Sequence, residues 1–319
     1  MSGRQKKQPQ NIPGGDVMPV ENEISQQKID ILAQDGHRLK ITVFDKRTGE
    51  DGSPVIICFP AMGVNADYYS GFARGLAGQD ITVATADLRG IGTSSLRASK
   101  GTNFGYFEMV HYDWPAVVGQ VEEMFPQQKI FLLDHSMGGQ LTSLYLSLQK
   151  KGRIAGLILI TTNSVYYRGY GFPDCVKVLA GINLAFLISR VMGYLPGHRF
   201  GFGGLEAKNV IRDWARQGRT GKYEILGSKL DYDALLGAIE LPVISISIEG
   251  DFFAPASAVR HLAGKMKNAE VTLVHLKPEA LNLKRKYHFS WAKRPENLIS
   301  LILDWMISVA PDTVTGERS

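Results

Sequence analysis

Short apolar runs alternate along this chain with longer segments in which apolar residues recur at helical spacing. This alternation of two periods is typical of βαβ units built around a parallel sheet. The runs predict strands at residues 28–32, 39–44, 55–59, 81–86, 129–133, 154–161, 243–248 and 271–276. The longer segments predict helices at residues 66–76, 107–125, 136–149, 256–266 and 295–308.

The first two predicted strands are joined by Asp35 and Gly36, a pair that favours a tight hairpin turn. The sheet is therefore expected to begin antiparallel and to become parallel. The run at residues 55–59 has no polar position, which is typical of a strand that helices cover on both faces. Together these elements predict an α/β fold with a mostly parallel eight-stranded sheet flanked by helices.

The regular alternation stops between the strands at 154–161 and 243–248. This stretch is rich in aromatic residues and glycine, contains a helical segment at 205–215 and has no clear strand. Because it leaves the sheet after one strand and returns at the next, we expect it over the carboxyl edge, where open α/β sheets bind ligands. It is therefore predicted to be a helical lid insertion, at residues 165–240.

The remainder of the chain divides into a core and two ends. These are a disordered lead-in at 1–24, an α/β core at 25–164 and 241–309, and a flexible tail at 310–319. Within the insertion, the apolar stretch at 178–189 is shorter than the ~18 to 20 residues that a spanning helix needs. We therefore expect no membrane span. The apolar stretch and the aromatic residues of the insertion could line an acyl pocket or touch a membrane surface, although packing of the insertion on the core explains the same residues.

The composition is that of a soluble globular protein. Of 319 residues, 44% are hydrophobic and 21% are charged, which excludes a disordered chain. The formal net charge of +5 is mild for this length and gives no reason to expect nucleic acid as a partner. Only Cys58 and Cys175 are present, and the first 23 residues lack the apolar core of a signal peptide, so a cytoplasmic location is expected.

Candidate chemistry is concentrated where the strand at 129–133 meets the next helix. The six residues from Asp134 read DHSMGG. A sharp strand–turn–helix lifts one side chain above the sheet and points the first amides of the helix towards it. The lifted residue is Ser136, which makes it the candidate nucleophile. The alternative is that Ser136 only caps the helix, because serine is a favoured N-cap residue.

This segment resembles the nucleophile elbow of the α/β hydrolases, Gly-x-Ser-x-Gly, with Asp134 in place of the first glycine. In that family the acid and the histidine follow the nucleophile in this order. The acid is assigned to Asp251, which comes directly after the strand at 243–248. Asn163 occupies the alternative acid region of the family but cannot carry the charge.

The base is assigned to His288, which lies between the last predicted strand and the final helix. The rival is His275, which falls within that strand and is expected to pack or bond locally. The resemblance also implies two backbone donors for the oxygen of a substrate carbonyl. One is the N–H of Met137. The other is the N–H of Ala61 or Met62, of which we favour Ala61, because the preceding Pro60 has no N–H.

No cofactor and no metal are expected. The chain has no His-x-x-x-His pair, no closely spaced cysteines and no Gly-rich phosphate loop after a strand. Basic residues flank His288 with no acidic residue among them, which favours an anionic substrate, although a solvated face explains the same pattern. These residues are Lys284, Arg285, Lys286, Lys293 and Arg294.

The elbow, the loop after residues 55–59 and the segment around His288 together look most like the lipase and serine aminopeptidase-like group. This resemblance implies a serine hydrolase that cleaves carboxylic esters, or thioesters or amides, of a lipophilic small-molecule acyl substrate through an acyl-enzyme on Ser136. Two alternatives stay open. One is acyl transfer by the same residues, and the other is a non-catalytic binding protein, which Asp134 in the elbow favours. The sequence gives no prediction of the oligomeric state.

Overall fold

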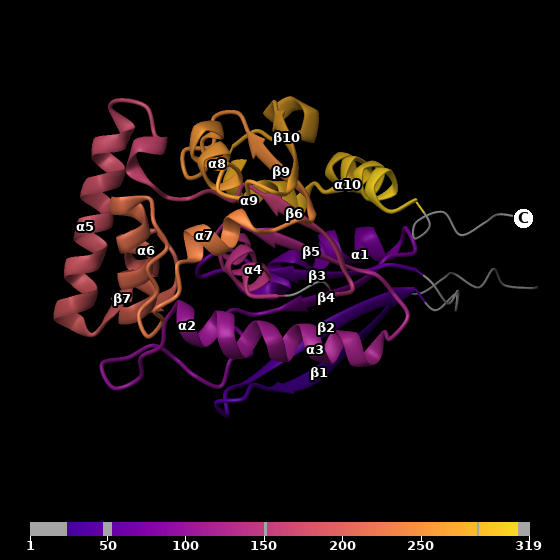
Figure 1. Ribbon diagram of the computed structural model, residues 1–319, viewed down its shortest axis with the longest axis horizontal. Coiled ribbons are helices and arrows are strands. Elements are labelled where there is room, and N and C mark those ends of the chain that lie inside the picture. Colours follow the sequence, from indigo (N-terminus) through magenta and orange to yellow (C-terminus); the bar gives the residue numbers. More distant parts are fainter. Residues whose placement is uncertain (1–23, 47–52, 150–151, 286, 312–319) are drawn as a thin grey trace, which may run out of the picture.

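An eight-stranded sheet forms the centre of the computed structural model, which describes residues 24–46, 53–149, 152–285 and 287–311 (Figure 1). The strand order is β1-β2-β4-β3-β5-β6-β9-β10. The strands are β1 Ile24–Leu32, β2 Arg38–Lys46, β3 Val55–Phe59, β4 Thr82–Ala86, β5 Ile130–His135, β6 Ile154–Ile160, β9 Pro242–Ile248 and β10 Glu270–Leu276. Every predicted strand is present, and the predicted mostly parallel sheet is confirmed.

The sheet begins with an antiparallel hairpin, as the sequence predicts. β1 pairs with β2 over its whole length, and Gly36 in the turn between them has a φ of +82°, which glycine adopts without strain. β2 also runs antiparallel to β4, and the other neighbouring strands are parallel. The carboxyl ends of β3, β5, β6 and β9 therefore meet at one edge.

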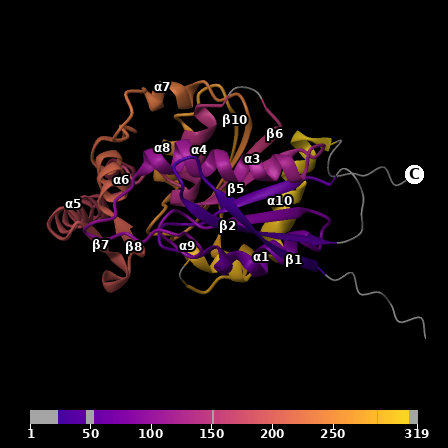
Figure 2. The same cartoon turned by 90° about the horizontal axis from the view of Figure 1, so that it is seen from below.

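The core lies in two layers, one on each face of the sheet. Helices cover both faces (Figure 2). Ile56 and Ile57 are neighbours on β3 and point to opposite faces, because side chains alternate along a strand. Ile57 packs in the layer covered by α3, α4 and α8, and Ile56 packs in the layer covered by α1 and α10. These helices are α1 Ser70–Ala77, α3 Trp114–Met124, α4 Met137–Ser147, α8 Ala256–Ala263 and α10 Glu296–Val309.

The predicted helix at 107–125 is divided in the structure. It consists of α2 Tyr106–Glu108, a π-helical turn at Met109–Asp113, and α3. Pro115 explains the division, because proline has no N–H to donate to the preceding turn and is tolerated at the start of a helix. The helix predicted at 66–76 is also divided, into a 3₁₀ turn at Ala66–Tyr69 and α1.

The segment at 165–240, called the insertion below, forms a layer outside the sheet (Figure 1). Its helices are α5 Asp174–Met192, α6 Lys208–Thr220 and α7 Tyr232–Gly237. The expectation of no strand here is wrong, because β7 Tyr194–Pro196 and β8 Leu205–Ala207 pair antiparallel. Strands of three residues are too short to give a period of two, and β8 takes the first turn of the helix predicted at 205–215.

α5 is longer than the apolar stretch at 178–189 that predicts it. It has 19 residues with a mean hydropathy of 1.7, so it is long and apolar enough to cross a membrane by length and composition, and only 17% of the most apolar window is buried. The expectation that this stretch is too short for a span is therefore wrong as to length.

Much of the predicted lead-in and tail lies outside the described residues. The described chain starts at Ile24, which opens β1, and ends at Pro311 beyond α10. Ala310, predicted to begin the tail, is buried. Three short helical turns and α9 complete the carboxyl-terminal part and the entry of the insertion. They are η3 Tyr167–Gly169, η5 Pro278–Leu281, α9 Tyr287–Ser290 and η6 Trp291–Lys293.

Candidate active site

Ser136 lies in the turn between β5 and α4, with a φ of +53° and a ψ of −116°. A positive φ is costly for a residue with a side chain, and such strain persists only where the surroundings hold it. Ser136 occupies the N-cap position of α4, yet its side chain makes no capping hydrogen bond. The hydroxyl of Ser136 therefore does not cap α4, and the alternative that Ser136 only caps the helix is wrong.

Two glycines after Ser136 let α4 approach the sheet. A Cβ on Gly138 would lie 2.7 Å from the carbonyl oxygens of Phe59 and Pro60, and one on Gly139 would lie 2.5 Å from Oγ1 of Thr162. Both distances are shorter than any ordinary contact with a Cβ. The start of α4 is therefore held against the ends of β3 and β6, which fixes the position of Ser136.

Asp134 replaces the first glycine of the elbow without obstructing the turn. Its side chain is buried within the sheet, where Oδ1 accepts a hydrogen bond from the N–H of Phe59 on β3 at 2.9 Å. Burial raises the pKa of Asp134 to about 8, against the opposing hydrogen bonds of Thr142 and Phe59. The carboxyl thus ties β5 to β3 instead of facing Ser136.

The structure brings Ser136, His288 and Asp251 together. Nε2 of His288 lies 3.1 Å from Oγ of Ser136, and Nδ1 of the same ring lies 2.8 Å from Oδ2 of Asp251. The three residues come from the elbow, from α9 and from the loop after β9, which reach the same edge of the sheet. Asp251 and His288 are buried, whereas Ser136 is half-buried and reachable from a cavity.

Hydrogen bonds fix the orientation of the Asp251 carboxylate. Its Oδ1 accepts the N–H groups of Phe253 and Ala254 at 2.9 and 3.3 Å, which leaves Oδ2 for the ring of His288. A carboxylate only accepts hydrogen bonds, so Nδ1 of His288 carries the proton. The lone pair of Nε2 then faces the hydroxyl of Ser136.

Of the backbone donors that the sequence suggests, two are free to face a substrate. Met137 is the first residue of α4, where an N–H has no partner within the helix. Met62 has no hydrogen-bond partner for its N–H in the described part of the chain. The N–H of Ala61 is engaged, because it donates to the hydroxyl of Tyr69 at 3.2 Å. The structure therefore favours Met62 over Ala61.

The rival groups have other partners. Nδ1 of His275 lies 2.9 Å from Oγ of Ser247, so His275 bonds locally on the sheet. The side-chain amide of Asn163 donates to the hydroxyl of Tyr170 and to the carbonyl of Phe253. It therefore holds the start of the insertion against the Asp251 loop and does not reach the ring of His288.

Ser136 opens into a cavity of about 90 Å³ between the sheet edge and the insertion. A Cβ on Gly63 would lie 2.0 Å from the backbone N of Gly204, so the glycine-rich loop of the insertion rests on the loop that carries Met62. None of the basic residues flanking His288 in the described part of the chain lines this cavity, and Lys286 lies outside the described residues.

A second cavity of about 270 Å³ lies beyond the first, under α5. Its lining is almost entirely apolar and comes from α5, β7, α6 and the loop after β9. The two cavities share one wall of aromatic residues, and all but one of these residues belong to the insertion. This aromatic wall consists of Tyr170, Phe202, Trp214 and Phe253.

One signal in the sequence could have pointed to this wall. Phe252 and Phe253 follow Asp251 directly, in a loop that otherwise begins with the polar and small residues Glu249 and Gly250. The centroid of the Phe253 ring lies 5.3 Å from that of the His288 ring and 6.3 Å from that of the Phe202 ring, so Phe253 connects His288 with the insertion.

Solved structures of esterases resemble this fold at low sequence identity. A thermostable carboxyl esterase from Bacillus coagulans, solved with glycerol, has a TM-score of 0.63 at 15% identity, covering 90% of this chain and 99% of that one. An esterase from Pyrococcus furiosus has a TM-score of 0.57 at 15% identity, covering 96% and 99%. Est1E from Butyrivibrio proteoclasticus, solved with ferulic acid, has a TM-score of 0.60 at 13% identity, covering 88% and 99%. At these identities the likeness concerns the fold.

No curated protein sequence matches the chain. Residues 52–241 match the sequence profile of a family described as serine aminopeptidase, S33. The match spans more than half of the chain and contains the elbow and the loop after β3, and it ends before Asp251 and His288. The chain therefore belongs to this serine aminopeptidase family, and it is an enzyme of the α/β hydrolase fold.

Proposed function

We propose that this protein is a serine hydrolase that cleaves carboxylic esters of a lipophilic acyl group through an acyl-enzyme on Ser136. The observation that carries the proposal is the pair of hydrogen bonds made by His288, at 3.1 Å to Ser136 and 2.8 Å to Asp251, beside a cavity. A serine hydroxyl is unreactive at its own pKa and needs a base within this distance.

In the proposed reaction Nε2 of His288 removes the proton of Ser136 as Oγ attacks the carbonyl carbon of the ester. The ring then carries a positive charge, which Asp251 stabilises while it holds Nδ1–H in place. The protonated ring passes its proton to the departing alcohol. Water then loses a proton to His288 as its oxygen attacks the acyl carbon. The bond from this carbon to Oγ of Ser136 breaks, the acid leaves, and the protonated ring returns the proton to Oγ.

The carbonyl oxygen becomes negative in each tetrahedral intermediate. Met137 and Met62 line the same cavity as Ser136, and their backbone N–H groups are assigned to this oxygen. Donors fixed before the reaction need no reorganisation when charge develops, and one of them is typically worth ~10² to 10³ in rate.

The cavity under α5 supports a lipophilic acyl group. Its lining includes Ile182, Ile188 and Leu195, and it shares the aromatic wall with the cavity that Ser136 lines. An apolar chain placed there leaves water for apolar contacts, which stabilises the complex by about 0.8 kcal/mol for each methylene.

The residues that line the two cavities favour an ester substrate over the amino end of a peptide. An aminopeptidase substrate carries an ammonium group, which needs a carboxylate partner when it leaves water. No aspartate or glutamate is among the residues that line either cavity in the described part of the chain.

A panel of soluble esters with acyl chains of graded length tests the proposal. We expect the wild type to hydrolyse them with an optimum above the shortest chain, and Ser136→Ala to lose the activity. Thioesters and amides of the same acyl groups extend the panel to the other bonds, and product analysis with added alcohol distinguishes transfer from hydrolysis. A folded wild type that turns over no member of the panel would contradict the proposal.

A further inference from the structure

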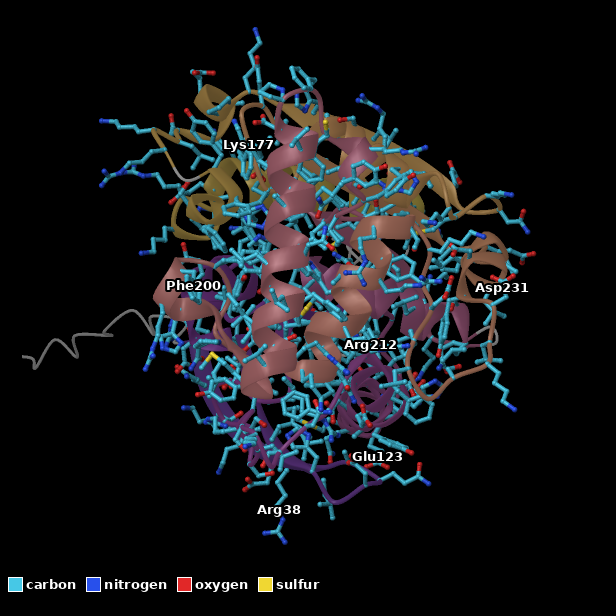
Figure 3. All side chains as sticks on the ribbon, turned by 90° about the vertical axis from the view of Figure 1, so that its left-hand side faces the viewer. Arg38, Glu123, Lys177, Phe200, Arg212 and Asp231 are labelled. Atoms are coloured by element: carbon cyan, nitrogen blue, oxygen red, sulfur yellow. The ribbon has the colours of Figure 1, made fainter. Side chains whose placement is uncertain are left out.

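An apolar stripe runs along the outer side of α5. Val176, Ala180, Leu184, Leu187 and Val191 recur every three or four residues, which places them on one face of the helix, and all five are exposed. The four larger side chains are each more than half exposed. In Figure 3 this helix crosses the face turned towards the viewer, with no part of the fold in front of it.

Two further exposed aromatic residues extend the stripe. Phe172 precedes α5 and is 86% exposed, and Phe200 follows β7 and is 62% exposed. We call these two residues and the stripe the α5 face. An apolar patch this continuous is unusual on a soluble monomer and marks a surface that binds a partner or a membrane.

The charges around the α5 face are mainly positive. Between residues 166 and 200 the chain has four basic residues and one acidic residue, Asp174. Arg190 and Arg199 are exposed and have no ion-pair partner within the described residues, whereas Lys177 pairs with Asp174 at 2.8 Å. Basic residues beside an exposed apolar helix are complementary to a surface of anionic lipid headgroups.

The α5 face also contains an entrance to the apolar cavity. Leu184 and Phe200 belong both to the face and to the cavity lining, and the exposed Phe252 lies on the same lining. An acyl chain that leaves a bilayer at this face would enter the cavity without crossing water. A second copy of the chain or a protein partner bound there would instead close this entrance.

One side of α5 packs against the rest of the insertion. Ile182, Ala185 and Ser189 are buried, and Ile182 packs on Gly218 of α6, where a Cβ would lie 2.6 Å from its Cδ1. Lipid therefore cannot surround the helix while the insertion is folded. The apolar length of α5 fits a helix that lies in the interface with its outer side in the acyl region.

We propose that the α5 face docks this protein on an anionic lipid bilayer, with the entrance of the apolar cavity turned towards the acyl chains. The docking itself does not depend on catalysis. The delivery of an acyl chain to Ser136 rests on the function proposed above.

Co-sedimentation with phosphatidylcholine vesicles, with and without phosphatidylserine, tests the docking. We expect the full chain to sediment with the anionic vesicles and to bind the neutral ones more weakly. The double variant L187E/V191E should lose about tenfold or more in partitioning, since two large apolar side chains no longer enter the interface. Neither position lines a cavity, so hydrolysis of a soluble short-chain ester should be unchanged.

Two control variants separate the contribution of the apolar α5 face from that of the basic residues. Leu32→Glu changes an equally exposed leucine at the end of β1 and should leave vesicle binding unchanged. R190A/R199A should weaken binding only to anionic vesicles, by about fivefold for each charge, because a cation near such a surface is worth about 1 kcal/mol.

Three results would overturn the docking: a wild type that stays in the supernatant, L187E/V191E that binds as well as the wild type, or a wild-type dimer that L187E/V191E converts to monomers. The last result would assign the α5 face to a second copy. Vesicle binding without turnover of any ester would leave the docking in place and contradict the proposed function alone.

Discussion

Nε2 of His37 lies 2.8 Å from Oγ of Ser94, and Nδ1 of the same ring lies 2.8 Å from Oδ1 of Asp113. The protein thus holds a second serine, histidine and aspartate in the geometry of the candidate site. All three are buried, none of them lines either cavity, and Asp113 also binds the guanidinium of Arg89. The hydrogen-bond distances are therefore similar in the two sets of residues. What distinguishes the set of Ser136 is its access to a cavity.

The first prediction concerns Ser94→Ala. Turnover of esters should stay within a few-fold of the wild type, because no substrate reaches Ser94. The free energy of unfolding should fall by about 1–3 kcal/mol, since the N–H of Gly90 loses the hydroxyl to which it donates. Steady-state kinetics and urea unfolding measure the two effects. A folded Ser94→Ala protein without activity would contradict the assignment of the site.

Asp251→Asn tests the role of the carboxylate. The amide keeps the size of the side chain but can donate to Nδ1 of His288, which stabilises the ring with its proton on the nitrogen facing Ser136. We expect kcat to fall by about 10⁴, with KM changed little, because the base then has the wrong tautomer. A loss of less than tenfold in the folded variant would exclude Asp251 as the group that orients His288.

Asp134→Asn is expected to change the pH dependence of stability. In the folded protein burial raises the pKa of Asp134 to about 8, from an ordinary value of 3.8. Between about pH 4 and pH 8 the folded state therefore binds more protons than the unfolded state, and stability falls as pH rises, by up to about 1.4 kcal/mol for each pH unit. The asparagine variant lacks this dependence.

The difference in free energy of unfolding between Asp134→Asn and the wild type should accordingly shift in favour of the variant from pH 5 to pH 8. Glu206 and Asp213, whose pKa values burial raises to about 7 and about 6, are present in both proteins, so their effects cancel. Parallel stability curves across this range would show that Asp134 is ionised in the fold.

Ala185→Phe tests whether the cavity under α5 holds the acyl chain. Ala185 lines this cavity, and a phenyl group there would fill part of it. We expect kcat/KM for the longest esters to fall by about tenfold or more, since each excluded methylene forfeits about 0.8 kcal/mol, while short esters are unaffected. Ala180→Phe, at an exposed position of the same helix outside the lining, is the matched control. Equal losses for short and long esters would contradict the assignment.

The sequence predicts the sheet well because strands covered on both faces are mostly apolar. β3, β4 and β5 are buried at every residue; the bounds of β3 are those predicted, and those of β4 and β5 differ from the predicted ones by one or two residues. The elbow is predictable for a similar reason, since a strand, a Ser and two glycines in a row permit few local structures. The assignment of Asp251 and His288 then rests on the resemblance to the α/β hydrolases, in which the acid and the histidine follow the nucleophile in this order.

The insertion is less predictable because long-range packing determines its structure. β7 and β8 exist only by pairing with each other, and three residues carry no period. The engagement of the N–H of Ala61 depends on the hydroxyl of Tyr69, which arrives from a separate turn. The aromatic wall likewise combines α6 with loops that lie far apart in sequence, so no local pattern shows that these rings meet.

The most direct test of the account is covalent labelling by a fluorophosphonate, followed by mass spectrometry of the intact protein and of its peptides. We predict one adduct per chain, located on Ser136, with labelling abolished in Ser136→Ala and retained in Ser94→Ala. A folded protein that takes up no label, or one labelled at a serine other than Ser136, would contradict the central claim that His288 activates this hydroxyl.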